Sequence, residues 1–303
     1  MPLGSSQVTI TTAATFIPEV WSDEIVAAYK KNLVAANLFK KMSFAGKKGD
    51  TVHLPSPTRG SASLKAENTQ VSLIAATEGD VAVSIDKHYE YSRLIEDIVE
   101  VQALSSLRRF YTDDAGYALA RQVDTSLIQL GRTFNGGSGV TYSGAYIGGD
   151  GTTAYNSGTP NASALTDAAI RRTIQRLDDN DVPMDGRFFL IPPSARNTLM
   201  GLARYTEQAF VGEAGGNNTI RNGEIGNLYG IPVFVSSNAD TATGAARICL
   251  LGHKDAAVLV EQQGVRSQTQ YKQEYLGTLY TADTLYGVKE LRDSSCFALA
   301  VPA

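Results

Sequence analysis

Cysteine and histidine are scarce in this chain, with two and three copies in 303 residues. Neither Cys249 nor Cys296 stands in a CxxC motif and the histidines are far apart, so the pattern argues against a zinc site. Both cysteines have apolar neighbours, which predicts buried, reduced thiols in strands. Reduced thiols fit a cytoplasmic environment. The three histidines are His53, His88 and His253.

The chain also lacks long apolar runs and a strong charge of either sign. No run approaches the ~20 residues that span a bilayer, and the first six residues show no secretory signal. The net charge of −4 predicts no strong overall attraction to nucleic acid. We therefore expect a soluble globular protein without a membrane partner, which remains where it is made.

Motifs for enzymatic chemistry are missing as well. No GxGxxG follows a strand, residues 45–51 do not form a P-loop, and neither GxSxG nor HExxH occurs. The acidic run 178–181 lacks the ligand spacing of a calcium loop and suits a solvated helix end. We expect no catalytic residue, no metal and no cofactor, so the chain is predicted not to be an enzyme. A cytoplasmic enzyme whose site assembles only in space stays open.

The N-terminal region combines a polar arm with a basic helix. Residues 1–15 predict an extended arm, and Pro18 suits a helix start. Apolar residues then recur every fourth position from Trp21 to Leu33. Between residues 29 and 48 there is no acid but six lysines, which form either a solvated helix face or a basic arm for an acidic partner. They are Lys30, Lys31, Lys40, Lys41, Lys47 and Lys48.

Two alternating segments, 49–54 and 79–85, predict strands that each follow Gly-Asp. The 55–78 segment between them has no clear period and exceeds the usual length of an ordered connection. It predicts a long hairpin that leaves the body to contact a neighbour, with a floppy surface loop as the alternative.

A helical period then runs from about Glu96 to Leu130. A helix of this length needs a sheet or a neighbouring subunit to cover its apolar stripe. The glycine-rich residues 131–161 predict a flexible inserted loop or hairpin and a candidate domain junction.

The second half mixes helices and strands without a βαβ repeat. Thr166 is a predicted N-cap, with Leu165 and Ile170 as its hydrophobic staple. Further patterns predict a helix over 194–205, strands over 187–192, 231–235, 247–251 and 257–260, and long antiparallel strands within 265–301. The order of elements indicates an α+β protein.

Four short segments occur in a fixed order along the chain. They are Phe16–Trp21, Asp181–Arg187 before an apolar strand, Gly226–Val233, and Tyr286–Arg292. Their order and spacing resemble the major capsid proteins of tailed double-stranded DNA bacteriophages. That resemblance implies a Hong Kong 97-like capsid fold, with an N-terminal arm, an extended β-hairpin called the E-loop, a P domain and an A domain. The P domain would carry a long spine helix and long antiparallel strands, and the A domain a central sheet flanked by helices.

The resemblance also implies a domain division. We expect an N-terminal arm and helix at 1–45, the E-loop hairpin at 46–92, and a P domain with spine helix and Gly-rich insertion at 93–165. The A domain would follow at 166–260, and 261–303 would hold the return to the P domain and the C-terminal strands.

The function that the resemblance implies is structural. Hexamers and pentamers of the chain would form an icosahedral phage head around double-stranded DNA, after assembly in the host bacterial cytoplasm. Expected partners are other copies, a separate scaffolding protein because the arm is short, a portal, a possible decoration protein, and DNA through weak contacts. A tail or decoration subunit is the alternative. The candidate inter-subunit contacts are Lys30, Lys31, Lys65, Glu67, Arg108 and Arg109.

Lys65 lies in the hairpin, where one relative of the family places a crosslinking lysine. No matching Asn partner or catalytic acid is identified in this sequence, so covalent crosslinking stays open.

Overall fold

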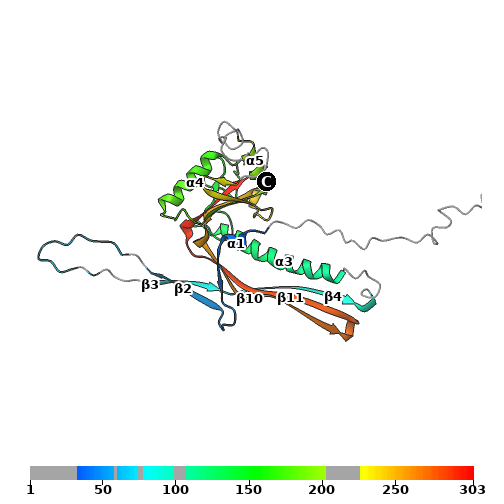
Figure 1. Ribbon diagram of the computed structural model, residues 1–303. Coiled ribbons are helices and arrows are strands. Elements are labelled where there is room, and N and C mark those ends of the chain that lie inside the picture. The colour runs from blue at the N-terminus through cyan, green and yellow to red at the C-terminus, as the bar shows by residue number, and fades with distance from the viewer. Residues whose placement is uncertain (1–32, 58–59, 72, 74–77, 99–106, 203–225) are drawn as a thin grey trace, which may run out of the picture.

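The computed structural model describes residues 33–57, 60–71, 73, 78–98, 107–202 and 226–303. These residues form a body that carries helices α4 (Asp167–Asp179) and α5 (Pro193–Met200), with two long projections that leave it in opposite directions (Figure 1). The predicted segment Phe16–Trp21 and the candidate contacts Lys30 and Lys31 lie outside the described residues. Within the described part of the chain, no helix is both long and apolar enough to cross a membrane.

The body is built on a mixed six-stranded sheet. Two neighbouring pairs, β5–β12 and β6–β8, are parallel, and the other three are antiparallel. The strands in spatial order are β5 (Tyr146–Ile147), β12 (Cys296–Val301), β9 (Arg247–His253), β6 (Arg187–Ile191), β8 (Ile231–Val235) and β7 (Asn227–Leu228).

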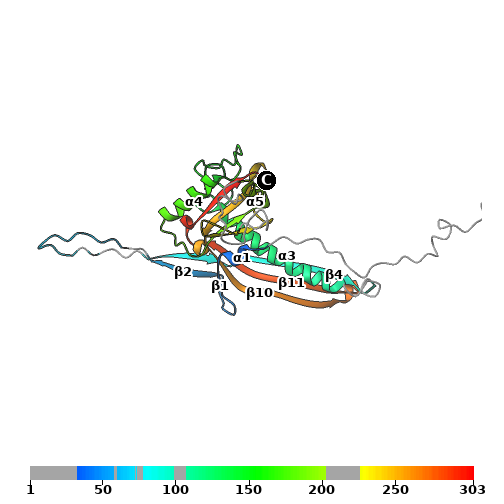
Figure 2. The ribbon, with the colours of Figure 1, turned by 45° about the horizontal axis from the view of Figure 1, so that its top comes forward.

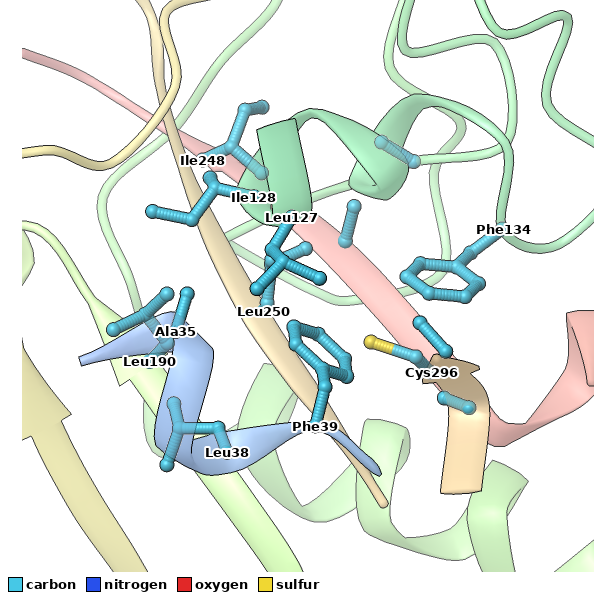
Figure 3. Packing of buried hydrophobic residues seen from close by; sticks show 14 of the residues in the cluster. Ala35, Leu38, Phe39, Leu127, Ile128, Phe134, Leu190, Ile248, Leu250 and Cys296 are labelled. Atoms are coloured by element: carbon cyan, nitrogen blue, oxygen red, sulfur yellow. The ribbon is translucent and has the colours of Figure 1, made fainter. Parts of the chain in front are cut away.

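Both faces of this sheet are buried, which explains why its strands are continuous apolar runs. Successive side chains of a strand point to opposite faces. In β9, Cys249 and Leu251 pack in the cluster with α4 and α5, whereas Ile248 and Leu250 pack in the opposite cluster. Figure 3 shows this second cluster, to which helix α1 (Ala35–Leu38) and the end of helix α3 (Leu107–Gln129) contribute.

The sequence signals at the start of α4 are confirmed. The Thr166 hydroxyl accepts a hydrogen bond from the Ala169 amide at 3.2 Å, as an N-cap does. Leu165 and Ile170 are both buried. Helix α5 ends at Met200, before the predicted limit of 205, and residues 203–225 are outside the described part.

A second, four-stranded sheet forms the longer projection. Strands β10 (Ala257–Lys272) and β11 (Gly277–Glu290) make a hairpin, with β1 (Lys40–Ser43) and β4 (Lys87–Glu96) at its two edges. Helix α3 lies along this sheet, where Ala115 and Leu119 pack against Ala282 (Figures 1 and 2). The predicted long antiparallel strands and the cover over the long helix are therefore confirmed.

The opposite projection is the antiparallel hairpin of β2 (Thr51–Pro57) and β3 (Glu78–Ser84). This confirms the predicted strand pair on either side of the patternless segment. The remaining short elements are 3₁₀ turns, η2 (Leu130–Arg132), η3 (Thr243–Ala245), η4 (Lys254–Ala256), η5 (Gln273–Tyr275) and η6 (Asp293–Ser295).

Three expectations need correction. Lys40 and Lys41 are in strand β1 rather than in a basic helix, because β1 pairs with the buried start of β10. Glu96 ends strand β4 instead of starting the long helix, because it pairs with Gly277 in the sheet. The Gly-rich segment is a packed loop, since its aromatic residues Phe134 and Tyr142 are buried in the body.

Two further observations concern the end of the chain. Cys249 and Cys296 are free, buried and in strands, as predicted. Strand β12, one of the C-terminal strands expected within 261–303, pairs with β9 inside the six-stranded sheet of the body.

Gly287, within the Tyr286–Arg292 segment, lies where β11 passes the end of β3. A Cβ atom there would approach the Ser84 carbonyl oxygen to 2.3 Å, and backbone cannot move away cheaply. We expect Gly287→Ala to lower the free energy of unfolding by about 1–3 kcal/mol, as overpacking does.

The matched control is Gly264→Ala, because nothing lies within 4 Å of a Cβ at Gly264. Urea denaturation of both variants measures the difference, and equal stabilities would contradict this account of Gly287.

Candidate subunit-contact surfaces

The chain enters the body at a buried carboxylate. Asp124 of α3 accepts hydrogen bonds from the Ala35 amide at 2.7 Å and from the Asn238 side-chain amide at 2.9 Å. Burial raises the pKa of Asp124, and the bonds from Asn238 and the α1 backbone partly offset this rise. Phe39 then packs edge-on against Phe188, with ring centroids 5.1 Å apart. These contacts fix residues 35–39 against the body.

The outer part of the β2–β3 projection exposes apolar and charged side chains to solvent. Leu64 and Leu73 are almost fully exposed, and Lys65 and Glu67 lie exposed beside them. At the base of the hairpin, His53 of β2 contacts Asp80 of β3. Exposed large apolar side chains on a projection are typical of a surface that a partner covers.

The far end of the β10–β11 hairpin carries a second apolar surface, which we call the tip patch. The Tyr271 hydroxyl donates to Asp97 at 2.7 Å, and the Asp97 amide donates to the Leu276 carbonyl at 2.9 Å, so three segments are joined there. Leu276 has a φ of 43°, an unusual backbone conformation for an apolar residue. The exposed members of the patch are Leu94, Ile98, Tyr271, Tyr275 and Leu276.

Sequence reasoning missed the tip patch. The available signal was the run Tyr275-Leu276-Gly277, which places two large apolar residues in a turn between polar strands. Leu94 joins them only because β4 pairs with β11, where Leu94 is opposite Leu279.

A cluster of polar side chains joins β4, β10 and β11 near the middle of the long hairpin. Asp283 of β11 accepts hydrogen bonds from Arg266 at 2.9 and 3.1 Å and from Gln263 at 2.8 Å, and His88 of β4 lies 3.2 Å away. The hydrogen bonds from Arg266 hold the pKa of Asp283 down, at about 2. The β10–β11 register shifts on both sides of Gln263, so the cluster ties together an irregular part of the sheet.

The candidate contact residues do not form one site. Lys65 and Glu67 are on the β2–β3 projection, whereas Arg108 and Arg109 lie in the first turn of α3, at the opposite end of the molecule (Figures 1 and 2). Contacts with several different neighbours would suit this separation better than a single pocket.

The described residues offer little for chemistry. No group of three or more His, Cys, Asp or Glu side chains among them could hold a metal ion. A small pocket beside the Gly-rich loop is lined in part by Arg132 and Tyr142. Both side chains bind Asp240, at 2.9 and 2.5 Å, so their polar groups are engaged in the fold.

An elongated subunit with two projections, exposed apolar ends and a small body belongs to the class of structural assembly proteins. The comparison with family models agrees, since the model described as phage capsid protein matches residues 82–292. The chain belongs to this phage capsid protein family. A comparison with curated protein sequences gives no match.

Solved structures show the same fold. A chain from Mycobacterium phage Che8 superposes with a TM-score of 0.75 at 24% identity, covering 94% of this chain and 97% of that one. The capsid of cyanophage P-SCSP1u gives 0.75 at 19% identity, covering 99% and 96%. The mature capsid of bacteriophage PhiM1 gives 0.71 at 14% identity, covering 94% and 92%.

The predicted Hong Kong 97-like fold and capsid family are thus confirmed. The protein is a structural major capsid protein of the virion, and its copies assemble into the capsid shell. Nothing in the comparisons supports the alternative of a tail or decoration subunit.

The Asp283 cluster predicts a loss of stability in acid. The pKa of Asp283 is about 2 in the folded protein and about 3.9 in the unfolded chain. The stabilisation of the fold by the ionised carboxylate is therefore complete above about pH 4 and is lost as the pH falls through 2. After allowance for solvent screening at the half-exposed Arg266, we expect a contribution of about 1 kcal/mol.

Denaturation of the isolated subunit at pH 6 and pH 2.5 measures this contribution. Asp283→Asn should be less stable than the wild type at pH 6 and should lose less stability in acid. Asp179→Asn, at an exposed position, is the control and should follow the wild type. Parallel acid profiles for wild type and Asp283→Asn would contradict the assignment.

Proposed function

We propose that this protein forms hexamers and pentamers of an icosahedral phage head that encloses double-stranded DNA, and that its role is assembly without catalysis. The observation that carries the proposal is the placement of exposed apolar side chains at both ends of an elongated subunit. Monomeric proteins rarely expose apolar surfaces of this kind, whereas neighbouring subunits that overlap in an assembly bury them.

The proposed partners follow from the same surfaces. Other copies of the chain cover the projections, while a separate scaffolding protein, a portal and a decoration protein complete the particle. Packaged DNA makes weak, non-specific contacts, in line with the net charge of −4. Assembly takes place in the host bacterial cytoplasm and requires no cofactor and no membrane.

The basic residues are proposed to contact neighbouring subunits or the scaffold more than DNA. Arg108 and Arg109 lie at the start of α3, and Lys40 and Lys41 are exposed on β1. The same role is proposed for Lys30 and Lys31, outside the described residues. Charge reversal at those two lysines should impair assembly. Shells that still form while tight, salt-sensitive DNA binding is abolished would contradict this role.

Electron microscopy of the purified protein tests the function. We expect closed shells or capsomer rings, with a co-expressed scaffold where one is needed. A stable monomer under every scaffold and crowding condition would overturn the proposal. Tubes, or a subunit that only binds to preformed shells, would instead support a tail or decoration protein.

The β2–β3 projection is proposed to be ordered by a neighbour. Hydrogen exchange should show fast exchange of residues 60–71, including Lys65 and Glu67, in free subunits and slow exchange in shells. Residues of β9, buried in every state, provide the internal control. Equal protection of the projection in both states would show that the neighbour has no such role.

Leu276→Asn separates assembly from folding. Asn tolerates the left-handed backbone at this position better than Leu, so subunit stability should stay the same or rise by up to about 1 kcal/mol. The tip patch loses an apolar side chain worth about 1.5–3 kcal/mol on burial, so the critical concentration for assembly should rise by at least about tenfold.

Light scattering against protein concentration measures this critical concentration. The control is Val140→Asn, which changes another exposed apolar residue, on the Gly-rich loop of the body. An effect of equal size in both variants would mean that the tip patch has no special part in assembly.

A further inference from the structure

Three segments of the body enclose a pocket that the proposed assembly role does not use. The first is η2 with Arg132, the second is the Gly-rich loop, and the third is the connection between β8 and β9, residues 236–246. The pocket is open to solvent and has a volume of about 300 Å³. This volume is at the lower end of the range for pockets that hold small molecules.

The side chain of Asp240 joins the three segments. Its carboxylate accepts hydrogen bonds from Arg132 Nε at 2.9 Å and from the Tyr142 hydroxyl at 2.5 Å. The backbone amide of Thr241 donates to the same carboxylate at 2.9 Å. One buried acceptor therefore fixes the relative positions of the pocket walls.

The β8–β9 connection also packs directly on the Gly-rich loop. The Tyr155 hydroxyl donates to the Thr243 carbonyl at 2.6 Å. A Cβ atom at Gly244 would approach the ring of Pro160 to 2.6 Å, so the two segments are in close contact. The pocket is thus formed before a ligand binds, which lowers the entropic cost of binding.

The polar lining of the pocket suits an uncharged ligand. Arg132 is the one charged residue among the described residues that line the pocket, and Asp240 balances its charge at 2.8 Å. A charged ligand would lose water without gaining an opposite charge, which is costly. Hydroxyl groups, which both donate and accept hydrogen bonds, make up most of the remaining polar lining. They belong to Thr141, Ser157, Thr241 and Thr243.

We propose that this pocket binds a neutral sugar residue. The hydroxyl groups of a sugar also donate and accept hydrogen bonds, so they match the hydroxyl lining without any charge. The exposed side chain of Val140 at the rim of the pocket would contact the apolar C–H groups of the sugar ring. Because the pocket is small, we expect a Kd on the order of 1 mM for a single sugar.

Saturation-transfer difference NMR on the purified full-length chain tests the ligand class. The probes are the methyl glycosides of glucose, galactose, mannose and N-acetylglucosamine, and at least one of them should receive saturation from the protein. Methyl glucuronide, which carries a carboxylate, should bind at least about tenfold more weakly than the best neutral probe. Binding of none of the neutral glycosides, or equal binding of the glucuronide, would overturn the proposal.

Hydroxyl removal tests the location of the site. Thr241→Val with Thr243→Val keeps the shape of two lining side chains and should weaken sugar binding about tenfold through the loss of two hydrogen bonds. The matched control is Thr152→Val with Thr159→Val, at two exposed positions of the Gly-rich loop outside the pocket lining, and it should bind as the wild type does. Equal affinities of the two double variants would overturn the assignment of the sugar to this pocket.

Ser157→Ala decides the case if the first double variant does not fold. It removes a hydroxyl from a different wall of the pocket and should weaken sugar binding several-fold, whereas an unchanged affinity would overturn the proposal. These measurements use free subunits. A negative result would therefore leave the proposed shell untouched, and a failure to form shells would leave the sugar site untouched.

Discussion

The continuous pairing of β10 with β11 is the interaction on which the rest of the subunit depends. It runs from Ala257 opposite Glu290 in the body to Lys272 opposite Gly277 at the far end. In β10, residues 257–260 are buried with the body, whereas residues 264–271 are exposed. Strands β1 and β4 pair with its edges and α3 packs on its face, so each position in the longer projection is set by this one hairpin.

A sheet that leaves its own core must be held straight by local contacts. The Asp283 cluster does so where the β10–β11 register shifts, by joining β4, β11 and β10. Farther out, Tyr271 and Asp97 connect the last turns. These polar contacts keep the tip patch in place without burying it, which leaves its apolar side chains for a neighbour. Such a subunit gives up part of its own hydrophobic stabilisation and recovers it on assembly.

Local patterns predicted many elements of this fold. The N-cap at Thr166, the apolar strands β6 and β9, and the alternating strands β2 and β3 were all readable, because capping and side-chain period depend on neighbours in the chain. The helical period before residue 107 was misleading at Glu96, where pairing with Gly277, distant in sequence, places the residue in a strand. Glycine content suggested a flexible loop at 131–161, but buried aromatic residues anchor it to the body.

The sequence by itself predicted the family and the class of function, through the order of short segments along the chain. The tertiary structure alone decided where contacts with neighbours can form. Lys65 and Glu67 could be predicted as exposed because they lie in a segment without a period. The tip patch could not be predicted, because it exists only once distant strands pair. The register of strand pairing brings together residues that are far apart in the sequence. A surface built across several strands therefore has no recognisable pattern in any one segment of the sequence.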